Sequence, residues 1–240
     1  MKILGRNSVS EAIASTKTID RLIVQKGLKD VQANRIIDAA KSRGIKIFFR
    51  EKETLDRETD NGRHQGFIAE VTDFNYSELK DILEYANSKN EPPFIILLDG
   101  VEDPHNLGSI LRVAECAGAH GVVIPRHRSV SVNDTVVKVS SGAAAHIKVA
   151  KVTNINDAID ALKKEGIWVY AADLGGDNLY KTKLTGAVAF VIGGEGKGVK
   201  KLTREKCDAV VSIPMLGKVN SLNASVATAV VVFEYVRQKG

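Results

Sequence analysis

The sequence predicts an α/β protein with a small N-terminal domain and a larger domain built on a mostly parallel sheet. Its 240 residues correspond to one or two domains. Short apolar runs alternate with segments of helical periodicity, which is typical of parallel strands covered by helices. The run FIILL at residues 94–98 is apolar without interruption, as expected of a strand buried on both faces.

The first 72 residues predict a compact α/β unit that we interpret as a separate domain. Ser8 and Glu11 have the spacing of a capping box, so a helix is expected over 8–15. A turn is expected at 60–62, where Asp and Asn precede Gly. Further strands are expected at 21–25, 45–49 and 66–71, and further helices at 31–42 and 52–59.

Residues 73–93 are interpreted as a linker that carries one helix, over 76–88, and ends in two prolines. Residues 94–240 then alternate strand and helix to the end of the chain. Strands are expected at 94–98, 121–124, 145–149, 168–170, 188–192 and 210–213. Helices are expected at 106–117, 132–140, 155–165, 200–206 and 221–238.

Composition favours a soluble globular protein, because 44% of the residues are hydrophobic and 26% are charged. The apolar run at 229–233 is far shorter than the roughly 18 residues of a membrane span. The first twelve residues contain no apolar segment of a secretory signal. Two cysteines, Cys116 and Cys207, and five scattered histidines have no metal-site spacing. We therefore expect a cytoplasmic protein with reduced thiols and no metal.

The charge is unevenly distributed along the chain. Residues 1–72 hold 14 basic and 10 acidic side chains, a net +4, whereas residues 73–240 hold 20 and 19, a net +1. A basic N-terminal domain indicates a polyanionic partner such as a nucleic acid. The alternative is an ordinary solvated surface rich in lysine.

Three polar loops follow predicted strands, where open α/β sheets bind ligands. The first, 99–109, leads into a helix that carries Arg112 among apolar residues, and Asn106 has the side chain of an N-cap. An arginine in such surroundings usually has a fixed anionic or planar partner. The alternative is a capped helix with a solvated arginine.

The second loop, GGEGKG at 193–198, is rich in glycine but matches neither the Walker A motif nor GxGxxG, because Val199 takes the last position. The third, 213–223, contains Asn220, Ser221 and Asn223 before the final helix. All three side chains are of N-cap types, so capping is the simpler interpretation of that loop. Three such residues where one cap is needed favour a further role.

These loops resemble, in order, the three motifs of the SpoU class of RNA 2′-O-ribose methyltransferases, in the TrmH/RlmB family of the SPOUT superfamily. The matching segments are DGVEDPHNLGSILR at 99–112, IGGEGKG at 192–198, and IPM at 213–215 followed by NSLNAS at 220–225. GRNSVSEA at 5–12 and HQG at 64–66 resemble the family's substrate-binding domain, which is similar to certain ribosomal proteins. The chain is most similar to the RlmB branch, which methylates a guanosine of 23S rRNA.

The resemblance implies an α/β trefoil-knot catalytic domain at 94–240, S-adenosyl-methionine as methyl donor, an RNA substrate and a homodimer. A dimer also agrees with the final helix, which is apolar around nearly its whole circumference. The implied cofactor-binding residues are Gly193, Gly194, Glu195, Ile213, Met215, Leu216, Leu222 and Ala224. The implied catalytic residues are Arg112, Asn106, Glu195, Ser221, Asn223 and Ser225.

Other functions stay open at this point. Relatives of the family methylate tRNA, or methylate rRNA and so confer antibiotic resistance. A non-catalytic RNA-binding protein would not need the polar residues of the three motifs. An ordinary Rossmann methyltransferase would need a glycine-rich turn after its first strand, where this chain has DGVEDP at 99–104.

Overall fold

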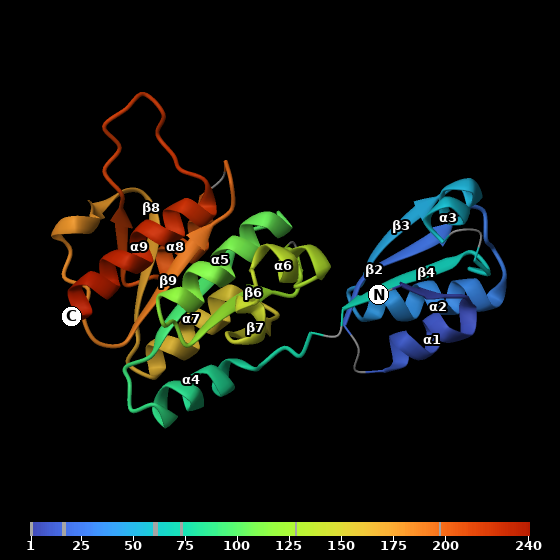
Figure 1. Cartoon of the computed structure of the whole chain (residues 1–240), viewed down its shortest axis with the longest axis horizontal. Coiled ribbons are helices and arrows are strands. Elements are labelled where there is room, and N and C mark those ends of the chain that lie inside the picture. The colour runs from blue at the N-terminus through green and yellow to red at the C-terminus, as the bar shows by residue number, and fades with distance from the viewer. Residues whose placement is uncertain (1, 16–17, 60–61, 73, 128, 197) are drawn as a thin grey trace. The chain divides into compact units, whose positions relative to one another are not determined.

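The chain forms two compact α/β units, Met1–Asn75 and Tyr76–Gly240 (Figure 1). The computed structural model describes residues 2–15, 18–59, 62–72, 74–127, 129–196 and 198–240. The linker predicted over 73–93 differs from this division, because its helix α4 (Leu79–Ser88) lies within the larger unit. Ile82 of α4 is fully buried and belongs to the same core cluster as Ile95 and Leu97.

The smaller unit is a four-stranded mixed sheet in the order β1-β4-β2-β3. Strands β2 and β3 are parallel, and β4 is antiparallel to both β1 and β2. Buried residues of α1 and α2, including Val9 and Ile36, pack on Leu22 of the sheet. The elements are β1 (Lys2–Leu4), α1 (Arg6–Ala14), β2 (Thr18–Gln25), α2 (Val31–Ser42), β3 (Lys46–Arg50), α3 (Lys52–Glu58) and β4 (Phe67–Thr72).

Two features of the smaller unit differ from the sequence prediction. Helix α1 begins at Arg6, so Ser8 lies inside the helix and forms no capping box. Gly5 is the N-cap with φ of 88°, and the Oε1 of Gln65 accepts a hydrogen bond from the Arg6 N–H at 3.1 Å. A side chain from a distant loop therefore accepts a hydrogen bond from one of the N–H groups that have no partner within the first turn of the helix. Strand β1 is only three residues long and is not predicted by any periodicity.

The predicted turn at 60–62 has its first two residues outside the described part of the chain.

The larger unit is a six-stranded parallel sheet in the order β10-β8-β9-β5-β6-β7. All six residues of β5 are buried, as the unbroken apolar run predicts. The strands are β5 (Phe94–Asp99), β6 (Gly121–Pro125), β7 (Lys148–Val152), β8 (Trp168–Asn178), β9 (Val188–Gly193) and β10 (Ala209–Ser212). The remaining helices are α5 (Pro104–Cys116), α6 (Asp134–Val139), α7 (Ile155–Lys164), α8 (Lys201–Lys206) and α9 (Ala224–Lys239).

Alternate residues of the central strands face two helical layers, which is why these strands are apolar throughout. Ile95 and Leu97 pack in the cluster that includes α4 and α7. On the other face, the ring of Tyr235 in α9 lies 4.5 Å from that of Phe94 and 6.1 Å from that of Phe190. No helix in the described part of the chain is long and apolar enough to cross a membrane.

Several boundaries in the larger unit also differ from prediction. Asn106 is not an N-cap: Asp103 caps α5 and Pro104 occupies the first turn. The strand expected at 145–149 begins later, at Lys148, after a 3-10 turn (Ala143–Ala145). Strand β8 continues to Asn178, well beyond the predicted end at 170. A register shift in its pairing with β10 marks an irregularity that periodicity does not reveal.

We expect Ile82→Ala to lower the free energy of unfolding of the larger unit by about 2–5 kcal/mol. Ile82 fills the space over Gly121, where an added Cβ would lie 2.5 Å from its Cδ1. Urea unfolding followed by the fluorescence of Trp168, the one tryptophan of the sequence, measures this unit alone. The exposed Glu84 of the same helix provides the control Glu84→Ala. Equal stability of the two variants would mean that this helix belongs to a linker.

Candidate active site

Two loops at the carboxyl ends of parallel strands, together with part of a third strand, surround a cavity of about 600 Å³ in the larger unit. The glycine-rich loop follows β9, the long loop after β10 leads to α9, and a third wall comes from residues 172–174 in the middle of β8 (Figure 1). Neighbouring parallel strands bring these ends to one edge of the sheet. Among the residues expected from the sequence, the cavity is lined by Gly193, Gly194, Glu195, Ile213, Met215, Ser221, Leu222, Asn223 and Ala224.

Glycines 193 and 194 permit backbone-to-backbone packing of the second loop. A Cβ on Gly193 would lie 2.1 Å from the carbonyl carbon of Gly198. A Cβ on Gly194 would lie 2.2 Å from the carbonyl oxygen of Gly100, so no side chain fits between the first and second loops. The Gly194 N–H donates a hydrogen bond to the Asp99 carbonyl at 3.1 Å, which joins these loops directly.

The carboxylate of Asp99 fastens the far end of the same loop to β5. Asp99 is buried, with 3% of its surface exposed. Its Oδ2 accepts a hydrogen bond from the Lys200 N–H at 3.0 Å, and its Oδ1 pairs with the Lys200 ammonium. A buried carboxylate requires such partners, because desolvation strongly disfavours an unpaired charge.

Asn106, Glu195 and Asn223, one from each motif, form a closed hydrogen-bond network beside the cavity. The Glu195 Oε1 accepts from the Asn106 Nδ2 at 3.1 Å and from the Asn223 Nδ2 at 2.7 Å. The Asn223 Nδ2 also donates to the Asn106 Oδ1 at 2.8 Å. The structure therefore brings together residues that lie as many as 117 positions apart.

Asn223 fulfils both roles considered for the third loop. It is the N-cap of α9, and its Oδ1 accepts from the Ser225 N–H at 2.9 Å and from the Ser225 Oγ at 2.6 Å. Its amide nitrogen is directed to Glu195 and Asn106 instead. The oxygen of the Asn223 amide thus caps the helix, while its nitrogen donates within the hydrogen-bond network. Ser225 is connected to this network through Asn223.

Arg112 lies apart from this network and does not line the cavity of its own chain. Six residues separate it from Asn106, which corresponds to about 9 Å along α5 and a different helix face. Its guanidinium is exposed and donates to the Ser141 Oγ at 3.3 Å. The fixed anionic partner expected from the sequence is absent among the described residues, so the charge is available to an external anion.

The structure also separates Leu216 from the predicted set, and the residues that it adds to the cavity include three from β8. The Leu216 side chain is 99% exposed and does not line the cavity. Ala172, Asp173 and Leu174 of β8 do line it. Sequence reasoning missed them because the predicted strand ends at 170. A longer strand with a polar end, ADLGG at 172–176, is the signal that indicates them.

No cluster of three or more potential metal-ligating side chains occurs within the described ranges of the chain. The two cysteines are unpaired, with Cys116 exposed and Cys207 partly buried. Burial, with a smaller effect of Asp208, raises the pKa of the Cys207 thiol to about 12. This thiol is therefore a poor nucleophile at neutral pH.

Comparison with known families assigns both units. Residues 93–233 match the SpoU rRNA Methylase family, and residues 2–77 match the domain described as RNA 2′-O ribose methyltransferase substrate binding. The chain belongs to the SpoU family, and its fold and site define the class of RNA 2′-O-ribose methyltransferases. The family match confirms this part of the resemblance seen in the sequence.

Individual relatives agree with this assignment. The Bacillus subtilis protein YacO is 42% identical to this chain over 239 residues, which are 99% of this chain and 95% of YacO. Its name places it in the TrmH family of tRNA/rRNA methyltransferases. A Staphylococcus aureus protein of the same family is 40% identical over 238 residues, 99% of this chain and 96% of its own.

Solved structures have the same fold. The SpoU methyltransferase AviRb from Streptomyces viridochromogenes, in complex with AdoMet, aligns with a TM-score of 0.63 at 24% identity, over 99% of this chain and 90% of AviRb. A TrmH family protein from Porphyromonas gingivalis aligns with a TM-score of 0.59 at 25% identity, over 99% and 90%.

We expect Asn106→Ala and Glu195→Ala to have non-additive effects on stability, with a coupling energy of about 0.5–3 kcal/mol. The reason is that each variant removes the same hydrogen bond, so the second substitution has no bond of this pair left to break. A double-mutant cycle measured by Trp168 fluorescence in urea gives this coupling. Glu195→Ala combined with Lys164→Ala, at the distant end of α7, is the control pair. Additive energies in the first pair would contradict the network.

Proposed function

We propose that the protein transfers the methyl group of S-adenosyl-methionine to a ribose 2′-hydroxyl of RNA, and that a guanosine of 23S rRNA is its target. The observation that carries this proposal is that the second and third motifs line one cavity and that Asn106 of the first motif is hydrogen-bonded to Glu195 and Asn223 in its wall. AviRb, which has the same fold, is described with AdoMet bound. The alternative targets are tRNA and an rRNA site whose methylation confers antibiotic resistance.

The cavity fits this methyl donor in size and chemistry. Its volume of about 600 Å³ lies in the usual range of small-molecule sites. Ile213, Met215 and Leu222 offer apolar surface for an adenine ring, and the backbone at Gly193 and Gly194 offers polar groups without side chains. S-adenosyl-methionine supplies an activated, electrophilic methyl group when it is bound there.

The chain's own task is then to hold the 2′-hydroxyl in line with this methyl group and to assist the loss of its proton. Positioning alone can supply a large part of the rate enhancement. Arg112 would hold the target phosphate or the 2′-oxygen, since its exposed guanidinium has only the Ser141 hydroxyl as a described partner. A guanidinium is a poor base, so charge stabilisation is the main contribution of this arginine. Asn106, Ser221 and Asn223 would orient the reactants.

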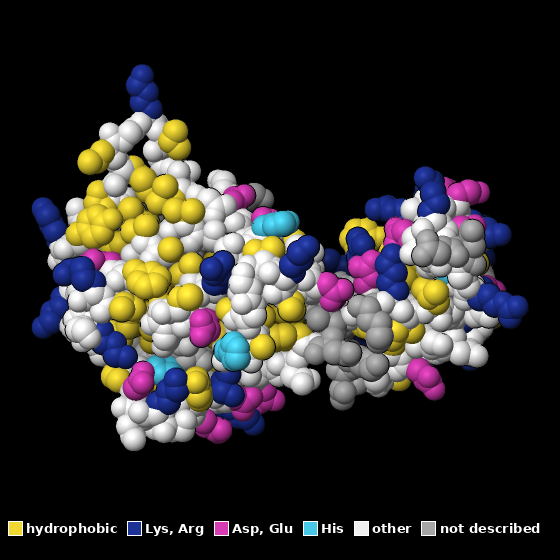
Figure 2. Space-filling model, in the orientation of Figure 1, with side chains coloured by type: hydrophobic (Ala, Val, Ile, Leu, Met, Phe, Trp, Pro, Cys, Tyr) yellow, Lys and Arg dark blue, Asp and Glu magenta, His cyan; other side chains and the backbone are white. Residues whose placement is uncertain are grey.

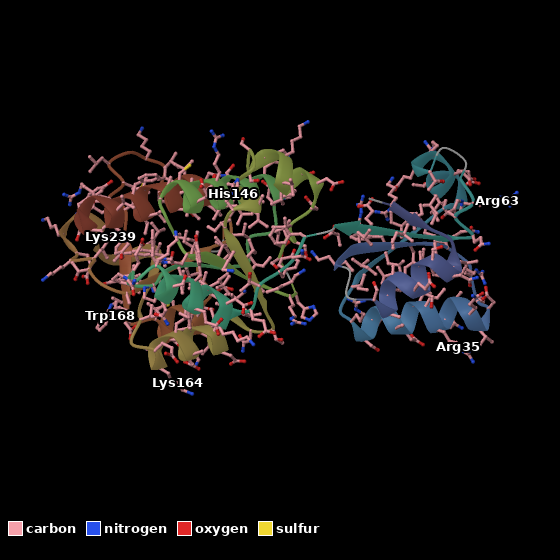
Figure 3. The ribbon with its side chains drawn as sticks, turned by 60° about the horizontal axis from the view of Figure 1, so that its bottom comes forward. Arg35, Arg63, His146, Lys164, Trp168 and Lys239 are labelled. Atoms are coloured by element: carbon pink, nitrogen blue, oxygen red, sulfur yellow. The ribbon has the colours of Figure 1, made fainter. Side chains whose placement is uncertain are left out.

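We expect Arg112→Ala to retain affinity for S-adenosyl-methionine and to lose methyl transfer by at least about a hundredfold. Calorimetry measures the first quantity, and transfer of labelled methyl to rRNA measures the second. Lys164→Ala, at the end of α7 (Figure 3), removes one charge from another helix and is the control. Near-normal turnover of the Arg112 variant would refute the assignment.

The RNA target is tested by mapping 2′-O-methyl groups in rRNA and tRNA from a strain that lacks this protein. Loss of one methylated guanosine in 23S rRNA, restored by the wild-type gene and not by the Arg112→Ala gene, is the expected result. Loss confined to tRNA would favour the alternative target and leave the reaction type intact.

We also propose that the C-terminal chain is knotted, as the family resemblance implies. Strand β10 is an edge strand paired with β8. The chain that follows returns past β8, so that Tyr235 of α9 packs on Phe94 and Phe190 of the two central strands. A knotted chain requires such a return path across strands that are already connected.

A homodimer formed through α9 is part of the same proposal. Val226 and Phe233 of this helix are 48% and 46% exposed. Figure 2 shows apolar side chains gathered over this part of the larger unit. Each large apolar side chain buried in an interface contributes about 1.5–3 kcal/mol before the costs of association. Two-fold dimers are the most frequent homo-oligomers.

We expect sedimentation equilibrium at micromolar concentration to give twice the chain mass, and Phe233→Glu to convert the dimer to monomers. A buried carboxylate in the interface would be unpaired and strongly unfavourable. Leu202→Glu on α8 places the same charge on another exposed apolar residue and should leave the dimer intact. A monomeric wild-type protein would contradict the proposal.

A further inference from the structure

The smaller unit contains a second cavity, of about 650 Å³, which the proposed mechanism does not use. It lies between the start of α1, the end of β2, α3 and the loop before β4. The motifs at 5–12 and 64–66 contribute Arg6, Asn7, His64, Gln65 and Gly66 to its wall. Two segments singled out in the sequence therefore meet at one concave surface.

The wall of this second cavity is held rigidly by His64. The His64 Nδ1 accepts a hydrogen bond from the Gly66 N–H at 2.9 Å, so the proton of the neutral ring is on Nε2 and is directed to the Asp56 Oδ1 at 2.8 Å. Between them, Gln65 has φ of 48°, an unusual value for a residue with a side chain. Such strain is concentrated at functional sites, where the surrounding structure maintains it.

Several polar groups at this cavity have no partner of their own. Arg6 is engaged with Asp30, through bonds of 2.7 and 2.8 Å. In contrast, Lys52 and Arg63 form no ion pair with any residue that the structure describes. The side-chain amide of Gln25 likewise has no hydrogen-bond partner among the described residues. Gln32 donates to the Asn7 Oδ1 at 3.2 Å, which leaves the Asn7 NH2 group to act as a donor.

We propose that this cavity receives one unpaired nucleotide of the substrate RNA, with Arg63 and Lys52 at its phosphates and the amides of Gln25 and Asn7 at its base edge. This inference rests on the proposed function and names the contact by which the smaller unit selects RNA. Amide side chains present the paired donor and acceptor that base edges require, and free cations bind phosphate.

The shape of the cavity favours an unpaired nucleotide over a duplex. A concave site can enclose a base only when that base has left the stack, and proteins read RNA sequence mainly in loops, bulges and ends. The alternative, a groove for an amphipathic helix of another protein, would be lined mainly by apolar side chains, whereas Leu28 is the one large apolar residue among those lining this cavity in the described chain.

The test uses the full-length protein and two fluorescent RNA hairpins of equal length, one with an unpaired loop of about eight nucleotides and one almost fully paired. Anisotropy gives their affinities over a range of salt concentrations. The proposal predicts that the wild type prefers the unpaired loop and that Gln25→Ala weakens this hairpin about tenfold, with little effect on the paired one. Arg63→Glu should weaken RNA binding. It should also reduce the number of counterions released on binding, given by the slope of log affinity against log salt concentration, by about one.

Arg35→Glu is the matched control, since it makes the same charge change on α2 and its residue does not line the cavity. Figure 3 shows Arg35 and Arg63 well apart on the smaller unit. Equal effects of Arg35→Glu and Arg63→Glu, or an unchanged affinity in Gln25→Ala, would overturn the proposal. Binding of S-adenosyl-methionine by the wild type is measured separately, so failure of the proposed reaction is distinguished from failure of this RNA site.

Discussion

The buried carboxylate of Asp99 is the interaction on which the larger unit's site depends. It ends the central strand β5 and holds Lys200, and so fixes where the glycine-rich loop returns to the sheet. Only with that loop in place does Glu195 meet Asn106 and Asn223. Because the contacts at Gly193 and Gly194 are between backbones, the loop has little freedom to adjust, and its anchor determines the geometry of the whole cavity.

The two cavities differ in charge in a way that suits different ligands. Among the described residues that line the active-site cavity are two carboxylates, Glu195 and Asp173, and no lysine or arginine. A sulfonium cation is favoured beside carboxylates. The cavity of the smaller unit is lined by Arg6, Lys52 and Arg63 and by one carboxylate, Asp56, in the segment whose net charge is +4. Separation of these charges in two units would disfavour binding of each proposed ligand at the other's site.

Much of the fold and part of the site could be predicted from the sequence. The run at 94–98 predicts a central buried strand because both of its faces are covered, and the helix predicted over 31–42 has the same bounds as α2. The family motifs indicate which loops matter. Periodicity could not reveal the extension of β8 to Asn178, since Gly175 and Gly176 interrupt its pattern, nor the role of Gln65 at the start of α1. Both depend on contacts between distant segments.

The separation of Asn106 from Asn223 by 117 residues also governs when this site can exist during protein synthesis. Contacts between distant segments require closure of a long loop and form late. A nascent chain that has exposed the whole smaller unit and strand β5 still lacks Asn223, the N-cap of the last helix. RNA-binding surface thus emerges from the ribosome well before the methyl-transfer cavity. Incomplete chains would capture RNA without modifying it, so loss of only the final helix should produce an inhibitor rather than an inert fragment.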